Sequence, residues 1–417
     1  MDISKKLKSK KIVAIAIDCG FNGVKMCING KLFVFPSYIF PITSKDELLM
    51  SNNSSDSIIY SERLSNRGTD SYVIGDMAKA LINKYSAIGE YQEFILKLKT
   101  LNVFFDMKEA IFLIRASIAY SLIKYSEDND IGFSLDDIGE FTIYLNLAFP
   151  HDLMHQAFGH LIGPLSADTS INIDINGNMY SINLNIKQEH ISCSSQVLAV
   201  FNELICDRNG VYSINMEELL NMLPAVVLDG GYRTQGIATI SKDKSLLVED
   251  VHSYEKYAMI EVNKETASII NDKAIDNGAI NYKPIMEYDI EPKIHSKIDF
   301  IYNIKDIDNG GRKRLVEVKF SEINEIRDNV LKKTANEYCD FLIDTYEIGN
   351  AKTIIVAGGT GAAYFDVIKE RISEYSGERI HTVLLEDTYD GEVISPVFTI
   401  VIGAYKGLMN ILRHEIE

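Results

Sequence analysis

Two distant segments of the chain repeat one pattern, in which an apolar strand ends on an aspartate and a glycine turn leads into a second strand. The first is IVAIAIDCGFNGVKMCING at residues 12–30, and the second is PAVVLDGGYRTQGIATI at residues 224–240. When the two are aligned, Asp18 falls on Asp229 and Gly20 falls on Gly231. Runs of this kind indicate buried strands. The repetition predicts an internally duplicated α/β protein whose related halves face each other across a cleft.

Each segment alone also has a simpler interpretation. Asp, Asn and Gly are the residues that turns require, so one Asp-x-Gly triplet commonly marks a polar hairpin turn. The alternative is a turn whose N–H groups bind phosphates, with Lys25 nearby and the carboxylate holding a hydrated Mg²⁺. A third segment, TIIVAGGTGAAYFDVIKER at residues 353–371, places four residues, GGTG, between a strand and an amphipathic helix. Such a turn suits anions or polar ligand edges, and three of them favour a nucleotide cleft.

Composition narrows the class of protein. The 417 residues are enough for two or more domains with substantial cores. The net charge of -17, with scattered Lys and Arg, argues against direct binding of nucleic acid, so a DNA link would need an adaptor. Five dispersed cysteines argue against a disulfide framework or a zinc site. The basic N-terminus precedes a short apolar run broken by Asp18, so we expect no signal peptide, no membrane span and a cytoplasmic location.

Other segments predict further helices and strands. Residues 90–125 have the apolar spacing of one or two long helices. FTIYLNLAFP predicts a strand, HDLMHQAFGHL a helix, and INIDINGNMYSINLNIKQEHIS a hairpin around Asn176 and Gly177. SSQVLAVFNEL predicts a helix that begins at a Ser cap.

Together these segments resemble the actin-like ATPases, and within them the plasmid-segregation actins of the ParM type. IAIDCGFNGVK is similar to their first phosphate loop, LDGGYRTQGI to the second, IIVAGGTGA to the adenosine motif and ISCSSQVLAVF to the connecting helix. VFPSYIF, SYVIGDMAKA and FTIVIGAYKGLMNI resemble the ParM and archaeal-actin branch more than sugar kinases or DnaK-type chaperones. The resemblance implies two related domains, each a mixed sheet flanked by helices, around a nucleotide cleft. Domain I would cover residues 10–222, with the C-terminal helix 396–417 returning to it, and domain II residues 223–395.

The resemblance also implies roles for individual residues. Asp18 and Asp229 would hold Mg²⁺ through waters, and Gln196 would place the attacking water, so these three form the predicted catalytic set. Hydrolysis would then proceed by positioning and charge stabilisation. The residues implied to bind ATP or GTP are Gly20, Phe21, Asn22, Lys25, Gly230, Gly231, Thr234, Gly358, Gly359, Thr360 and Gly361.

The sequence departs from the family pattern at several positions. The first loop has FNG at residues 21–23 where many relatives carry Ser, Thr or another Gly, and Arg233 precedes the Thr of the second loop. Arg233 would either add charge at the phosphates or face solvent. Ser195 stands where relatives often have Pro, which could displace Gln196 by one residue. Glu189, expected within the preceding strand, is the alternative to Gln196.

The function implied by the resemblance is a cytomotive filament. Subunits would bind ATP or GTP, polymerise head to tail, hydrolyse the nucleotide and depolymerise. They would segregate plasmid DNA through an adaptor bound to a plasmid centromere.

Other functions would make different demands on the chain. A small-molecule kinase of the same superfamily is the alternative, and it would need a base such as Asp152 aimed at a substrate hydroxyl. A chaperone would need an added peptide-binding domain. HDLMH carries Asp152 where a zinc-protease helix requires Glu, and GGRKR at residues 310–314 predicts a solvated hairpin turn.

Overall fold

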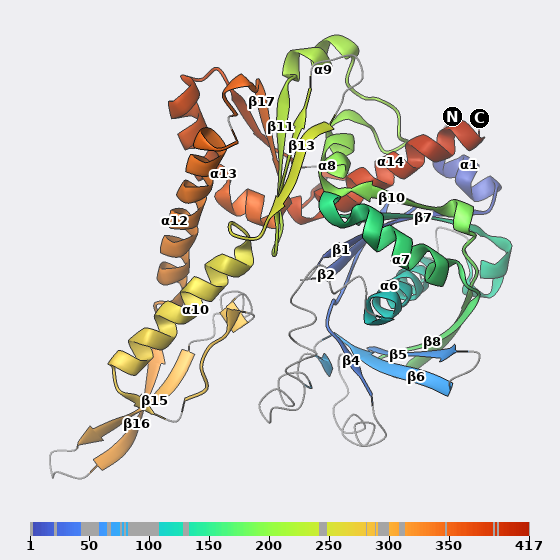
Figure 1. Ribbon diagram of the computed structural model, residues 1–417. Coiled ribbons are helices and arrows are strands. Elements are labelled where there is room, and N and C mark those ends of the chain that lie inside the picture. Colours follow the sequence, from blue (N-terminus) through green and yellow to red (C-terminus); the bar gives the residue numbers. More distant parts are fainter. Residues whose placement is uncertain are drawn as a thin grey trace. The chain divides into compact units, whose positions relative to one another are not determined.

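The computed structural model describes most of the chain. The described residues are 3–20, 23–42, 58–64, 68–75, 77–78, 81, 108–127, 133–241, 248–280, 282–287, 289–290, 300–307, 313–346, 348–386, 388–389 and 392–416. They belong to two compact units (Figure 1): unit 1 comprises Met1–Leu219 and Phe398–Glu417, and unit 2 comprises Leu220–Val397. Within the described ranges, every helix is too short or too polar to span a bilayer.

Unit 1 forms two five-stranded sheets from its described residues, one ordered β10-β7-β1-β2-β3 and the other β4-β6-β5-β8-β9. The strands are β1 (Ile12–Gly20), β2 (Gly23–Ile28), β3 (Lys31–Phe35), β4 (Ile39–Pro41), β5 (Ile58–Leu64), β6 (Gly68–Ile74), β7 (Thr142–Phe149), β8 (Thr169–Ile175), β9 (Asn178–Leu184) and β10 (Ile191–Ser195). The helices and 3₁₀ turns are α1 (Ile3–Ser9), α6 (Lys108–Ser126), η1 (Leu135–Glu140), η2 (His151–Leu153), α7 (Met154–Ser166), η3 (Gln188–His190), α8 (Gln196–Ile205) and α14 (Thr399–Ile416).

Unit 2 is built around a five-stranded sheet ordered β13-β12-β11-β17-β18, and its described residues also form the smaller sheets β14-β15-β16 and β19-β20. The strands are β11 (Ala225–Gly230), β12 (Gln235–Ile240), β13 (Val248–Tyr254), β14 (Ala279–Ile280), β15 (Phe300–Ile307), β16 (Lys313–Phe320), β17 (Thr353–Ala357), β18 (His381–Leu384), β19 (Thr388–Tyr389) and β20 (Glu392–Val393). The helices and the 3₁₀ turn are α10 (Met259–Asp276), α12 (Ile323–Asp344), η4 (Ile348–Asn350) and α13 (Gly358–Ser376). α9 (Met216–Met222) and η5 (Pro396–Phe398) lie where the chain passes from one unit to the other.

The principal sheets of the two units have the same plan. In unit 1, β1 pairs in parallel with β7 and antiparallel with β2. In unit 2, β11 pairs in parallel with β17 and antiparallel with β12. β1 and β11 are buried along their length, as expected for central strands of Ile, Val, Leu and Ala that are covered on both faces. The predicted α/β architecture of two related domains with mixed sheets and flanking helices is confirmed.

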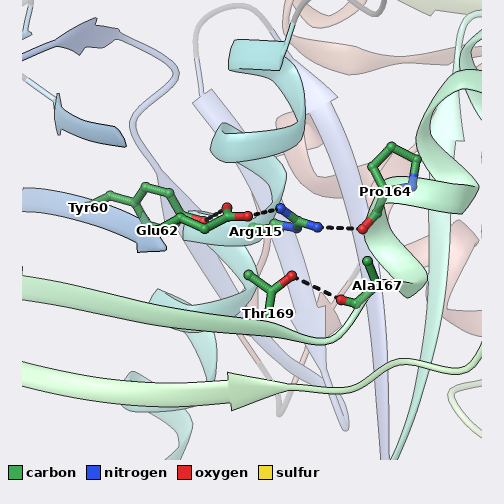
Figure 2. A network of polar contacts seen from close by, with 6 residues as sticks. All are labelled: Tyr60, Glu62, Arg115, Pro164, Ala167 and Thr169. Carbon is green, nitrogen blue, oxygen red and sulfur yellow. Dashed lines mark hydrogen bonds and ion pairs between the residues drawn. The ribbon is translucent and has the colours of Figure 1, made fainter. Parts of the chain in front are cut away.

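A buried polar network joins the second sheet of unit 1 to two helices (Figure 2). Helix α6 is apolar on nearly all sides, so the charge of Arg115 needs a partner inside the protein. The Arg115 guanidinium pairs with the Glu62 carboxylate of β5 and also donates to the Pro164 carbonyl of α7. Tyr60 donates its hydroxyl hydrogen to the other oxygen of Glu62 at 2.7 Å. The network therefore fixes the sheet, α6 and α7 against one another.

Several local predictions can be compared with these elements. The predicted hairpin is confirmed: β8 pairs with β9, and the turn between them lies at Asn176 and Gly177, both at positive φ. The helix predicted for HDLMHQAFGHL is also confirmed, as η2 and α7. The long helical pattern is confirmed over α6, and residues 90–107 lie outside the described residues. β15 and β16 pair antiparallel, while residues 310–312 of the GGRKR turn also lie outside them.

Candidate functional site

Asp18 lies near the end of β1, and two side chains contact its carboxylate. The residue is 2 % exposed, so water does little to stabilise its charge. Lys25 lies directly opposite on β2 and places its ammonium nitrogen 3.4 Å from Oδ2. The amide nitrogen Nε2 of Gln196 donates to Oδ1 at 2.9 Å. These three residues, with Gly20, are called the Asp18 site below.

The hairpin register explains why Gly20 is needed beside Lys25. A Cβ atom added at Gly20 would lie 2.5 Å from the Lys25 ammonium nitrogen and 2.9 Å from the Gly23 carbonyl oxygen. The missing side chain therefore leaves space for the ammonium. Cys19 lies beside this site, and burial, together with the Asp18 charge, raises the pKa of its thiol. Burial at this position therefore disfavours the thiolate form of Cys19.

Gln196 is the first residue of α8, which begins directly after β10. Ser195 occupies the predicted cap position with extended backbone, but its hydroxyl makes no capping hydrogen bond. Since an ionised carboxylate only accepts hydrogen bonds, Asp18 orients the Gln196 amide with its nitrogen inward. The carbonyl oxygen Oε1 is then the atom that could accept a hydrogen bond from a water molecule.

Asp229 is the equivalent carboxylate of unit 2 and is 4 % exposed. It is the penultimate residue of β11, next to Gly230 and shortly before Gly231. The Gly231 N–H donates to the Thr234 carbonyl at 2.8 Å, which closes the turn between β11 and β12. Thr360 of α13 donates its hydroxyl hydrogen to the Gly231 carbonyl at 2.7 Å. The second and third glycine motifs of the sequence therefore meet, and we call this cluster the Asp229 site.

Glycines at the Asp229 site allow two backbone segments to touch. A Cβ at Gly230 would lie 2.0 Å from the Gly361 nitrogen, and a Cβ at Gly358 would lie 2.4 Å from the Gly230 carbonyl oxygen. Gly358 also has a φ of +77°, which glycine adopts without strain. The glycines therefore let the start of α13 approach the end of β11 at backbone distance. Gly359 is exposed at the same helix start.

Other predicted residues have different outcomes. Arg233 is 8 % exposed and burial lowers its pKa, so the solvent-facing alternative for this side chain is wrong. Glu189 was expected within a strand, but it is exposed in the 3₁₀ turn η3, because the strand begins only at Ile191. Asp152 is exposed in η2. Phe21 and Asn22 lie outside the described residues.

The oxygen donors present fit Mg²⁺ held with waters. Mg²⁺ retains several waters and is commonly bound by one or two carboxylates together with substrate phosphates. Asp18 and Asp229 are buried carboxylates at turns rich in glycine, which is the donor type that Mg²⁺ prefers. In the described parts of the chain, no three His, Cys, Asp or Glu side chains are grouped as an all-protein metal site would require.

Comparisons with known proteins address the fold. No protein-family model matches the chain, and no curated protein matches its sequence. Among solved structures, the actin-like protein Alp7A superposes with a TM-score of 0.65 at 13% identity, covering 97% of each chain. A 15-stranded ParM filament from Clostridium botulinum gives 0.58 at 15% identity, covering 94% of this chain and 98% of that one. Bacillus thuringiensis ParM with ATP gives 0.52 at 12% identity, covering 97% and 100%. The chain therefore has the actin-like ATPase fold of ParM and Alp7A.

Proposed function

We propose that this chain is a filament-forming actin-like protein that binds and hydrolyses ATP or GTP and segregates plasmid DNA through a DNA-binding adaptor. The observation that carries the proposal is the duplicated placement of Asp18 and Asp229. Each is a buried carboxylate near the end of the central strand of its sheet, beside a glycine turn. The fold supports the same proposal, because one structural neighbour is a ParM filament and another is ParM with ATP.

The proposal assigns a role to each of these residues. Lys25 and the backbone N–H groups of both turns bind phosphate oxygens. Asp18 and Asp229 hold Mg²⁺ through waters, and bound Mg²⁺ would neutralise charge on the phosphates. Gln196, oriented by its hydrogen bond to Asp18, presents Oε1 to the attacking water. Positioning is the main requirement, since phosphoryl transfer asks for little covalent chemistry.

Light scattering of the purified protein on addition of Mg-ATP or Mg-GTP tests the function as a whole. We expect scattering to rise only above a threshold protein concentration, and to decay as nucleotide is consumed, with phosphate release followed in the same sample. EDTA should abolish both signals. The kinase alternative predicts no scattering and no phosphate transfer until a small hydroxylated substrate is supplied, and that result would replace the filament proposal.

The substitution Asp229→Asn tests the proposed Mg²⁺ role of the unit 2 carboxylate. It keeps the size of the side chain and removes its charge, so affinity for Mg-nucleotide should fall by about 10- to 100-fold, as for groups that hold a metal through its outer shell. Titration with a fluorescent nucleotide measures this change. In EDTA the affinity should be unchanged or higher, because a negative charge near the phosphates is lost.

The exposed Asp366 of α13 offers a matched control. Asp366→Asn makes the same chemical change in the same unit and should leave both affinities as they are. Equal Mg-nucleotide affinity in Asp229→Asn and the original protein would remove Asp229 from the proposed site.

A further inference from the structure

Helix α14 packs against α8 (Figure 1). Gly403 of α14 faces the carbonyl of Ala199, in the first half of α8. A Cβ atom added at Gly403 would lie 1.7 Å from the Ala199 carbonyl oxygen and 2.5 Å from its carbon. Backbone atoms cannot rotate away as a side chain can, so any side chain here would force the helices apart. The absence of a side chain at Gly403 therefore sets the spacing of the two helices.

A buried ion pair fixes the C-terminal end of α8. The Lys406 ammonium of α14 donates to the Glu203 backbone carbonyl at 2.7 Å and lies 3.1 Å from the Glu203 carboxylate oxygen Oε1. Both side chains are 6 % exposed. The carbonyls in the last turn of a helix lack partners within the helix, so a buried ammonium there both caps α8 and fixes its position along its axis.

A third contact links α14 to the strand that leads into Gln196. Asn146 lies in β7, between β1 and β10. Its amide nitrogen donates to the Ala404 carbonyl of α14 at 2.8 Å and lies 3.4 Å from the Ser194 hydroxyl. Ser194 precedes Gln196 by two residues. The contacts to α14 are thus distributed along the short helix α8. Gly403 meets Ala199 in the first half of α8, and Lys406 binds Glu203 in its last turn. Asn146 links α14 to Ser194, just before α8 begins.

We propose that α14 positions Gln196. Gly403 and Lys406 hold α8 where the Gln196 amide reaches Asp18, and Asn146 fixes the preceding strand to the same helix. The inference rests on the proposed function, since it assigns to this packing an effect on hydrolysis. Its physical basis is that displacing a catalytic group by about 1 Å can cost 10²-fold in rate. Gly403, Lys406 and Asn146 are positioning residues that do not contact the nucleotide.

A matched pair of glycines allows a direct test. Gly403→Ala and Gly407→Ala make the same change in the same helix and raise helix propensity equally. At Gly407, however, the new Cβ would meet only the end of the Asn202 side chain, at 2.9 Å, which can move. We expect Gly403→Ala to lower the single-turnover rate of hydrolysis by roughly 10- to 100-fold. Its nucleotide affinity should stay within about twofold of the original, and Gly407→Ala should match the original in both.

The same substitution in a Gln196→Ala background separates positioning from general damage. If Gly403 acts through Gln196, Gly403→Ala should cause no further loss of rate once the amide is absent. An equal loss in both backgrounds, or an unchanged rate in Gly403→Ala alone, would overturn the inference. A normal rate in Gln196→Ala would instead reject the proposed role of Gln196, so the two failures are distinguishable.

A second variant covers the case in which Gly403→Ala does not fold. Lys406→Met combined with Glu203→Gln removes the ion pair without leaving a buried charge unpaired. It should lower the rate and spare nucleotide affinity in the same way, and its effect should also vanish in the Gln196→Ala background. A normal rate in this double variant would likewise count against positioning by α14.

Discussion

Replacing Gln196 with alanine should slow phosphate release by about 10²- to 10³-fold, the usual cost of removing one preorganised hydrogen-bonding group from a catalytic site. The effect is expected in hydrolysis and not in binding, because the Gln196 amide contacts Asp18 and would contact the attacking water. Nucleotide affinity should change little, and filaments should still form. Phosphate release and light scattering recorded together should show filaments that persist after those of the original protein have decayed.

Gln188 of η3 provides the control for this experiment. It is exposed and lies in the segment that precedes β10, so Gln188→Ala makes the same change away from the Asp18 site. Its rate should equal that of the original protein. Normal phosphate release in Gln196→Ala would remove Gln196 from the catalytic set. The hydrogen bond from Gln196 to Asp18 would then have no part in hydrolysis.

Replacing Arg115 with methionine should lower the free energy of unfolding of unit 1 by about 3–5 kcal/mol, because it leaves the Glu62 carboxylate buried and unpaired. The loss is a large fraction of the stability of a typical domain. Urea denaturation followed by circular dichroism measures it. A loss below about 1 kcal/mol would mean that the pair shown in Figure 2 adds little to stability.

Combining Arg115→Met with Glu62→Gln tests whether the unpaired charge causes that loss. Gln at position 62 is neutral and still accepts the hydrogen bond from Tyr60, so most of the stability should return. A double variant as unstable as Arg115→Met alone would assign the effect to lost packing of the arginine stem.

Local sequence predicted the elements that depend on residues close together in the chain. The β-branched runs at residues 12–18 and 225–229 became β1 and β11, because such strands are buried on both faces of a sheet. The Asn176-Gly177 turn formed because both residues tolerate positive φ. The approach of Lys25 to Asp18 and Gly20 also follows from local pairing, because these residues belong to one hairpin.

Contacts between residues far apart in the chain could not be predicted from local sequence patterns. Gln196 was assigned by resemblance, and its contact with Asp18 spans 178 positions. Arg233 is buried although exposure is usual for arginine, since its surroundings come from other parts of unit 2. The expectation that Glu189 lies in a strand was wrong because strand ends depend on pairing, and β10 pairs with β7 only from Ile191. The spacing of Gly403 and Gly407 was visible in FTIVIGAYKGLMNI, but only the fold identifies α8 as their partner.

By itself, the sequence determined that this chain carries two strand-aspartate-glycine units, because apolar alternation and turn chemistry act over a few neighbouring residues. The tertiary structure alone decided which side chain each aspartate meets. The Asp18 carboxylate accepts hydrogen bonds from Lys25 and Gln196. Asp229 instead lies where β11 contacts the start of α13. The reason is physical: hydrogen bonds, ion pairs and backbone contacts are specified by distance in space, and separation along the chain does not encode that distance.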